Sequence, residues 1–310
     1  MKEIYSRNRK MGRGKKYENM TYSIVSRCCN RMLIGKTYWK GVVLPSVLHG
    51  AGLINSEEGV TKKIQSTENG VYRKILGARR NTVVETLRGE VGASAAETRF
   101  MESRLMLVKS IWKGKNKWVK GILKKVRGEG DNPWNKVLRK YLQNLNITFD
   151  QLIEMSVREL KIRVRYYDNR KWREGMENKS SVKIYKRFKK KVKEEKLYDN
   201  RRESEILFQA RANCMALNNR YRHIAGREGE TVCDLCKNGV EDLEHFMLNC
   251  KELEGKRNRE IMEEGRREDK EEWMGNILWE SEDMVGVKKM VGEMWQERAK
   301  RRKRMGLNAR

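Results

Sequence analysis

Proline is nearly absent from this sequence, with only Pro45 and Pro133 among 310 residues. Turn signals for strand hairpins, such as Asn-Gly or Asp-Gly between alternating apolar residues, are also scarce. Lysine, arginine, glutamate, leucine and methionine, all good helix formers, are abundant. These features argue against a β-rich protein and predict a mainly α fold.

Long hydrophobic runs are missing as well. No stretch approaches the roughly 18 consecutive apolar residues of a membrane-spanning helix, and Met1 to Lys16 is basic and polar, without the apolar core of a signal peptide. We therefore expect a soluble, intracellular protein, nuclear or cytoplasmic, with no membrane partner. A hydrophobic content of 38% favours several thin cores over one thick core.

Residues arranged for catalysis are sparse. His49 and His223 stand without a paired carboxylate or nucleophile, so we interpret them as structural or surface histidines. The string Tyr166–Asn169 has one aspartate, whereas polymerases hold catalytic magnesium with two or more, and we interpret it as a helix end. No glycine-rich phosphate loop occurs between a strand and a helix. The chain as it stands is not predicted to be an enzyme.

Positive charge dominates the composition: 70 Lys and Arg against 42 Asp and Glu give +28. Such a chain repels itself unless a polyanion neutralises it, which makes nucleic acid the favoured partner and an anionic membrane surface the second. The charge is uneven, with net +29 over residues 1–232, net −8 over 233–297 and net +7 over 298–310. This predicts a basic body, an acidic metal-bearing module and a basic tail.

Helix boundaries are marked by capping residues. Ser56 with Glu57 and Glu58 predicts a helix that ends at Gly77. Capping pairs begin further helices at Thr82 with Glu85, Ser94 with Glu97, Ser156 with Glu159, and at Asn132 before Pro133. Segments 114–117 and 127–132 lack apolar periodicity and are expected to be loops.

Five segments are predicted. The boundary near residue 128 is weak, and a second weak boundary, between 174 and 181, lies inside the second segment. The segments are a basic helical region (1–128), a basic helical connector (129–230), a metal-bearing module (231–256), amphipathic acidic helices (257–297) and the basic tail (298–310).

The most specific motif is Cys233-x2-Cys236, followed after eight residues by His245 and after four more by Cys250. Three thiolates and one imidazole suit tetrahedral zinc, and four protein ligands leave no position for a catalytic water. We expect one structural zinc, with His245 on a short helix over 240–248 and Leu243, Phe246 and Met247 packed in a module too short to fold without metal. The alternative is a cysteine cluster that binds no metal.

The other cysteines, Cys28, Cys29 and Cys214, are interpreted as free thiols buried among apolar helical positions.

Two basic segments are candidate nucleic-acid sites. The first interleaves cations with aromatic rings that suit base stacking, although the solvated face of an amphipathic helix is the alternative; its candidates are Lys183, Tyr185, Lys186, Arg187, Phe188, Lys189, Lys190, Lys191 and Lys193. The second is the tail 298–304, which has six cations in seven residues and suits nuclear import or anchoring, with a disordered tail as the alternative. Its candidates are Arg301, Arg302, Lys303 and Arg304.

An apolar helix face can also be drawn through the acidic segment. Its members are Trp273, Ile277, Leu278, Met284, Val287, Met290, Val291 and Trp295. This face could pack on the chain's own body or bind a protein partner through residues 257–297. The alternative function is therefore a zinc-containing protein-interaction module of a host protein.

Six ordered blocks of the sequence stand out together: Tyr38–Gly50, Ile64–Gly77, Glu85–Gly92, Phe208–Arg211, Asn218–Arg220 and Cys233–Cys250. In this order they resemble the region after the catalytic palm in reverse transcriptases of non-LTR (LINE-type) retrotransposons. The resemblance implies a helical thumb-like bundle, a further helical region and a small zinc-knuckle-like module with a C-terminal helix, which help to hold template RNA and target DNA. The Tyr/Phe-x-Asp-Asp palm motif and the endonuclease domain are absent. The resemblance therefore implies a nucleic-acid-binding fragment of an RNA-directed DNA polymerase that is inactive alone.

Overall fold

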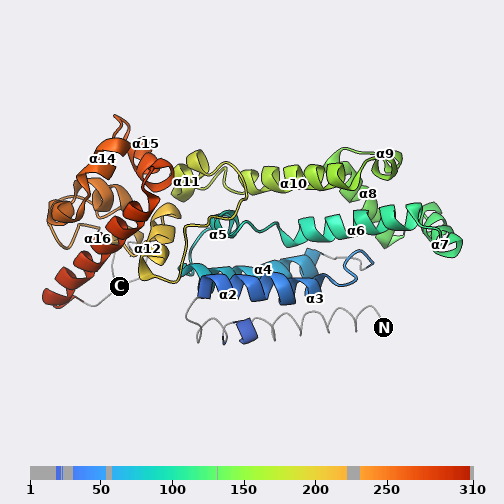
Figure 1. Cartoon of the computed structure of the whole chain (residues 1–310), viewed down its shortest axis with the longest axis horizontal. Coiled ribbons are helices and arrows are strands. Elements are labelled where there is room, and N and C mark those ends of the chain that lie inside the picture. The colour runs from blue at the N-terminus through green and yellow to red at the C-terminus, as the bar shows by residue number, and fades with distance from the viewer. Residues whose placement is uncertain are drawn as a thin grey trace. The chain divides into compact units, whose positions relative to one another are not determined.

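The computed structural model describes residues 19–21, 23, 31–53, 58–130, 132–221 and 231–307. These residues are mainly helical and include no β-strand, only an isolated antiparallel bridge between Val232 and Val240 (Figure 1). The predicted mainly α fold is confirmed. No helix in this part of the chain is long and apolar enough to cross a membrane. The predictions for Met1 to Lys16, Cys28, Cys29, Ser56, Glu57 and His223 fall outside the described ranges.

The chain forms two compact units. The described residues within 34–71 and 92–175 belong to unit 1, and those within 72–91 and 176–310 belong to unit 2. The division after residue 175 falls within the stretch 174–181 where the sequence predicts a weak boundary.

The first half of the chain contains the longer helices. They are α2 (Arg31–Tyr38), η1 (Trp39–Val43), α3 (Leu44–Leu48), α4 (Glu58–Leu76), α5 (Val84–Val91), α6 (Ala96–Lys113), α7 (Lys117–Gly128), α8 (Pro133–Leu145), α9 (Phe149–Glu154) and α10 (Val157–Glu174). Gly77, at φ +62°, ends α4 as predicted. The carboxamide of Asn132 and the hydroxyl of Ser156 accept backbone N–H bonds as the predicted N-caps of α8 and α10.

The second half is built from shorter helices and one long one. They are η2 (Ser180–Val182), α11 (Lys183–Phe188), α12 (Arg202–Arg211), α13 (Asn218–Tyr221), η3 (His245–Asn249), η4 (Lys251–Lys256), α14 (Arg259–Gly265), α15 (Lys270–Gly275), η5 (Asn276–Glu280) and α16 (Met284–Arg304).

One core joins α6 to α10 in unit 1. Met101 of α6, Leu123 of α7, Leu138 of α8, Leu152 of α9 and Leu160 of α10 belong to a single buried cluster. The loop that follows residue 128 is present, but the helices on both sides of it share this core. The predicted boundary near 128 therefore lies inside unit 1, because loops that lack periodicity also occur between helices of one core.

The start of α6 differs from its prediction. Its N-cap is Ala95, not Ser94, and the cap bond comes from a distant residue: Asp168 Oδ1 accepts from the Ala95 amide at 3.0 Å and from the Thr98 hydroxyl at 2.8 Å. Asp168 lies inside α10, so the interpretation of Tyr166–Asn169 as a helix end was wrong. The buried carboxylate satisfies the Ala95 amide, for which the local sequence supplies no side-chain cap. Helix α5 likewise begins at Val84, two residues after the predicted cap Thr82.

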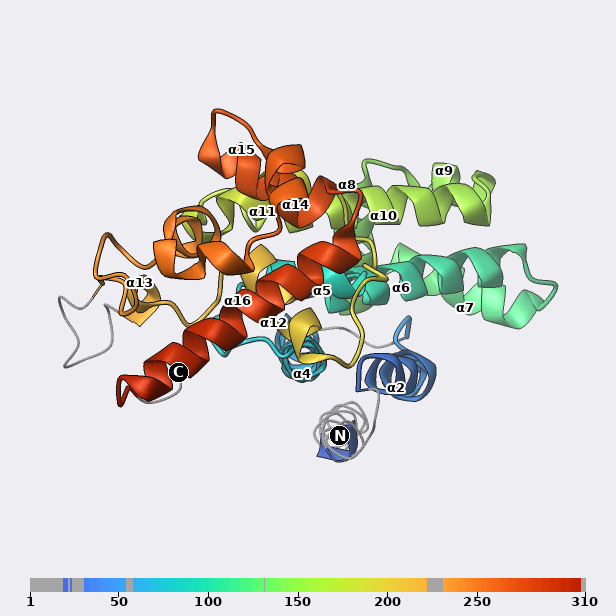
Figure 2. The ribbon, with the colours of Figure 1, turned by 60° about the vertical axis from the view of Figure 1, so that its left-hand side comes forward.

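Helix α16 organises unit 2. It packs along α12, as Figure 2 shows, and contacts η4 and η5. The apolar face predicted within the acidic segment 257–297 is largely buried within this unit, with Ile277, Leu278, Val287 and Val291 fully enclosed. That face is therefore used for the chain's own folding. Helix α16 also continues to Arg304, so the predicted basic tail is the end of a packed helix rather than a separate segment.

Candidate metal centre

A tight loop holds the first two cysteines. The Cys233 amide donates to the Gly239 carbonyl at 3.0 Å, and the Lys237 amide donates to the Cys233 carbonyl at 3.0 Å. Lys237 and Gly239 have φ values of +55° and +80°, which let the chain reverse within a few residues. This reversal turns both thiols toward the same point.

A short helix supplies the histidine, as predicted, although its turns are π-helical over His245–Asn249. The Asp242 carboxylate caps it by accepting from the His245 amide at 2.8 Å. Leu243, Phe246 and Met247 are buried, which confirms their predicted packing. Cys250 follows directly after this helix and completes the set.

The four ligand atoms are close enough together to surround one ion. All lie within 4.8 Å of one another, with Cys233 Sγ 3.9 Å from Cys250 Sγ and Cys236 Sγ 3.3 Å from His245 Nε2. Zinc bonds of about 2.3 Å to sulfur and about 2.0 Å to nitrogen predict edges of about 3.8 and 3.5 Å in a tetrahedron. The predicted residues are thus brought together in a group that can hold a metal ion, and no disulfide joins the three cysteines.

The side chains of the cluster affect one another's protonation. The hydrogen bond with Cys250, together with burial, raises the pKa of Cys233 far above its usual range, and the same bond lowers the pKa of Cys250. Burial lowers the pKa of His245 and favours the neutral imidazole that metals bind. Two adjacent thiols resist joint ionisation unless a cation lies between them.

A buried ion pair lies beside the cluster and connects it to α16. Arg298 Nε and Nη2 donate to the two oxygens of Glu241, both at 2.7 Å, and both side chains are only 2% exposed. Glu241 Oε2 also accepts from the Asn218 amide at 2.8 Å, and Glu241 Oε1 lies 4.0 Å from Cys233 Sγ. This bidentate pair joins α16 and the start of α13 to the cysteine loop.

Two further arginines of α16 contact the same module. Arg302 is buried and forms an ion pair with Asp234, between the first two cysteines, and Arg301 pairs with Glu252 of η4. Arg301 and Arg302 were predicted as nucleic-acid contacts, but both form ion pairs with acidic residues of the module. Lys303 and Arg304 are exposed, and their role in nucleic-acid binding stays a prediction.

In the other predicted segment, 183–193, the cations Lys183, Arg187 and Lys189 pair with carboxylates. Lys183 bonds Glu271 at 2.8 Å, and Arg187 bonds Asp269 at 3.0 Å and Glu272 at 2.7 Å. Phe188 stacks on the Trp279 ring at 5.8 Å. Lys186 reaches the Glu177 carbonyl, while Lys190, Lys191 and Lys193 have exposed side chains whose binding role stays a prediction.

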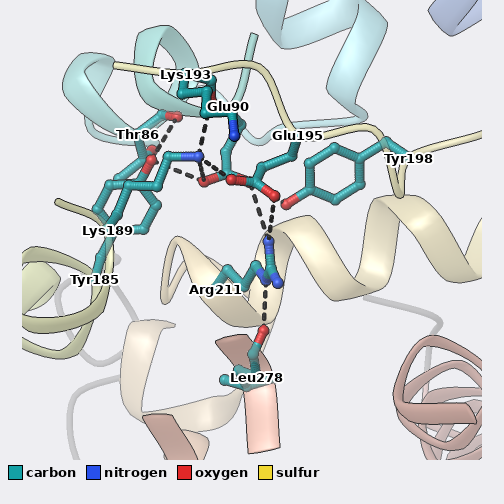
Figure 3. Close-up of polar contacts among 9 residues, drawn as sticks. All are labelled: Thr86, Glu90, Tyr185, Lys189, Lys193, Glu195, Tyr198, Arg211 and Leu278. Carbon is teal, nitrogen blue, oxygen red and sulfur yellow. Dashed lines mark hydrogen bonds and ion pairs between the residues drawn. The ribbon is translucent and has the colours of Figure 1, made fainter. Parts of the chain in front are cut away.

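Tyr185 and Lys189 are buried in a polar network around Glu90 (Figure 3). The Tyr185 hydroxyl donates to Glu90 at 2.9 Å, and Lys189 pairs with Glu195 and, at 3.7 Å, with Glu90. Burial and the Glu90 carboxylate raise the pKa of Tyr185 well above its usual range. Tyr185 therefore has no exposed face on which a base could stack.

The same network contains Arg211 of α12. Its Nη1 lies 3.4 Å from Glu90, its Nε donates to the Leu278 carbonyl at 2.7 Å, and the Tyr198 hydroxyl also donates to Glu90 (Figure 3). Two carboxylates and two cations balance within the cluster. Its role is structural, since burial of charge is tolerated only with such pairing.

Arg298 was not among the predicted site residues, and Arg302 was predicted to contact nucleic acid and not the metal-site module. Arg298 and Arg302 are spaced by four and continue the buried stripe Val287, Val291 and Met294 of α16. That periodicity was a usable signal that both arginines face the protein. Nothing local indicated that Glu241 and Asp234 would be their partners.

Of the cysteines outside the cluster, Cys214 is buried as predicted, and burial raises its pKa. It lies between α12 and α13, however, so the prediction of a helical position was wrong. His49 is exposed.

Comparison with known proteins yields no relative: no family model, no curated protein and no solved structure matches the chain.

Proposed function

We propose that this chain is a nucleic-acid-binding protein in which Cys233, Cys236, His245 and Cys250 hold one structural zinc ion. We further propose that it corresponds to the region that follows the catalytic domain in non-LTR retrotransposon reverse transcriptases. The proposal assigns it no polymerase or nuclease activity. The sequence offers no aspartate pair, and Asp168 is used as a helix cap.

The main support for nucleic-acid binding comes from the solvent-exposed face of α10 in unit 1. Arg158, Lys161 and Arg165 are exposed there and form no ion pair within the described residues. Ile162 and Tyr166 lie exposed between them, and Tyr166 is 71% accessible. Unpaired cations interleaved with an accessible aromatic ring are typical of surfaces that follow a phosphate backbone.

The metal supports this role by holding structure. Four protein ligands close the coordination sphere, so the ion would cross-link the loop at 233–236 with the helix at 245–249. Arg298 and Arg302 then dock the end of α16 on that module. The zinc site thus stabilises unit 2 and takes no part in a reaction.

The resemblance to reverse transcriptases gains support from contacts between its blocks. Glu90, in the block 85–92, meets Arg211, in the block 208–211, and Asn218 meets Glu241 of the cysteine block. These residues are far apart in sequence yet form buried bonds. These blocks therefore lie in one folded unit, as a shared function of the blocks would require.

Binding of labelled single-stranded RNA and duplex DNA at several salt concentrations, with zinc quantified on the same sample, tests the proposal. We expect about one zinc per chain and a binding constant that falls linearly with salt on logarithmic axes, by about 0.7–0.9 for each phosphate contact. Replacing Arg158, Lys161 and Arg165 by glutamine should reduce that slope. Absence of salt-dependent binding to either nucleic acid would overturn the binding role, and absence of zinc would overturn the metal role.

The protein-interaction alternative has less support, because the apolar face on which it depended is buried in unit 2. A partner retained after nuclease treatment would favour it.

A further inference from the structure

Helix α7 exposes a tryptophan that the core does not use. Trp118 is 86% accessible and Ile122 is 62% accessible, while Leu123 on the opposite face is buried in the core of unit 1. The Asn116 side chain accepts bonds from the Trp118 and Val119 amides and so fixes the first turn of the helix. The indole is therefore presented to solvent from a capped and anchored helix.

A shallow hollow lies beside this ring. It has a volume of about 390 Å³ and is lined by Lys117, Trp118, Gly121, Ile122 and Lys125. A Cβ at Gly121 would meet nothing within 4 Å, so the absence of a side chain there keeps the hollow open. The walls are apolar, and a lysine stands at each end.

The charge around the hollow is of one sign. Residues 113–127 contain seven cations and no acidic residue. No ion pair within the described chain includes any of these cations; Lys120 and Lys124 lie over the Trp112 ring, at 5.2 and 5.8 Å. A ligand that complements this face must be anionic and must offer a flat apolar group.

We propose that α7 is a stacking site for single-stranded nucleic acid. A base would lie in the hollow against the Trp118 ring, and Lys117 and Lys125 would contact the flanking phosphates. This inference rests on the proposed nucleic-acid-binding function and names the residues that distinguish a single strand from any other polyanion, because a duplex keeps its bases stacked internally.

An anionic bilayer fits the helix less well. Interfacial helices insert a broad apolar face, whereas the apolar side of α7 that contains Leu123 is already packed in the core. Only Trp118 and Ile122 are more than half exposed on the solvent side. Two side chains flanked by lysines match a strand of nucleotides better than a lipid surface.

The experiment compares an oligouridylate strand with an abasic strand of equal length and charge, both fluorescently labelled, on the full chain. Wild type should bind the strand with bases more tightly. Trp118→Ala should weaken that binding by about 5- to 150-fold, as expected for one lost base stack, and leave the abasic strand unchanged. Trp118→Phe, which keeps an aromatic face, should retain most of the preference.

A second variant fills the hollow without removing the indole. Gly121→Leu should raise helix stability, because leucine is the better helix former, and should lower affinity only for the strand with bases. If Trp118→Ala and Gly121→Leu both bind like wild type while binding remains salt-dependent, the stacking site is wrong and the proposed function stands. If neither strand binds wild type, the proposed function fails with it. Trp118-dependent binding to phosphatidylserine vesicles, with RNA binding unaffected, would instead identify a membrane-contacting helix.

Discussion

Two segments of this chain look alike in sequence and differ in structure. Residues 113–127 in unit 1 and 183–193 in unit 2 each contain seven cations, at least one aromatic residue and no acid. In unit 2, Lys183, Arg187 and Lys189 are paired with carboxylates distant in sequence. In unit 1, none of the cations of 113–127 forms an ion pair with a described residue. Local charge density therefore does not identify a binding surface.

The source of the difference is the acidic segment of unit 2. Residues 233–297 have a net charge of −8, and Glu271, Asp269 and Glu272 from this segment neutralise α11. The end of α16 is neutralised in the same way by Glu241 and Asp234. Part of the positive charge of unit 2 is therefore used in its own fold, whereas the cations of 113–127 in unit 1 form no such ion pairs among the described residues.

Metal removal should break this arrangement with the largest effect. Structural zinc contributes on the order of 10 kcal/mol of apparent binding free energy in small modules, so Cys236→Ser or a chelator should make residues 231–256 sensitive to protease and release the partners of Arg298 and Arg302. The core of α6 to α10 should stay folded. Cys214→Ala, at a buried thiol outside the cluster, should retain zinc. Unchanged protease resistance at 231–256 in Cys236→Ser would contradict a metal-dependent module.

Removing one partner of the buried pair should have the next largest effect. Arg298→Met leaves Glu241 without its bidentate partner in a site that is 2% exposed, and we expect a loss of about 3–5 kcal/mol in the free energy of unfolding. Replacing both Arg298 and Glu241 by methionine should recover part of the loss. Arg304→Met, an exposed site on the same helix, should change stability by no more than about 0.5 kcal/mol. Denaturant unfolding measures all three, and equal effects at Arg298 and Arg304 would show that α16 does not dock through its buried arginines.

How much the sequence could predict depends on whether the interacting residues are close together or far apart in the chain. Asn132, Ser156 and Gly77 mark helix ends because a cap acts on its own helix, and the cysteine spacing marks the ligands because they lie within 18 residues. Long-range partners have no such local signal. Asp168 caps α6 from 73 residues away, and Arg298 meets Glu241 across 57. The set of four metal ligands was therefore predictable. The ion pairs that hold α16 against the metal-site module, and those that neutralise Lys183 and Arg187 of α11, were not.

Substituting two cations in each segment tests the comparison between 113–127 and 183–193 directly. Lys117→Gln with Lys125→Gln should weaken nucleic-acid binding and lower the salt slope by about 0.7 for each phosphate contact removed. Lys183→Gln with Arg187→Gln removes the same charge from unit 2, where the cations already contact carboxylates. That variant should bind nearly as wild type and lose little stability, because solvent screens exposed ion pairs. Equal loss of affinity in both variants would mean that total charge, and not its pairing, controls binding.

The smallest effect is expected at the Asp199–Lys288 pair, in which Lys288 is a further cation neutralised within unit 2. Lys288 Nζ lies 2.7 Å from Asp199 Oδ2. Burial acts to raise the pKa of Asp199, but hydrogen bonds from Lys288, the Ser204 hydroxyl and the Arg201 amide outweigh it and lower the pKa from 3.8 to about 2. Because the folded pKa lies below the unfolded one, the carboxylate stabilises the fold above about pH 4, and this contribution is lost as the pH falls toward 2.

The carboxylate is 41% exposed, so solvent screening keeps the effect small. Unfolding measured between pH 5 and 2, a window set by that pKa shift, should give a shallower acid-side slope for Asp199→Asn than for wild type. Lys288→Met should flatten the slope as well, since it removes the main hydrogen-bond donor. A wild-type slope in both variants would show that this pair adds nothing to the internal neutralisation that separates unit 2 from unit 1.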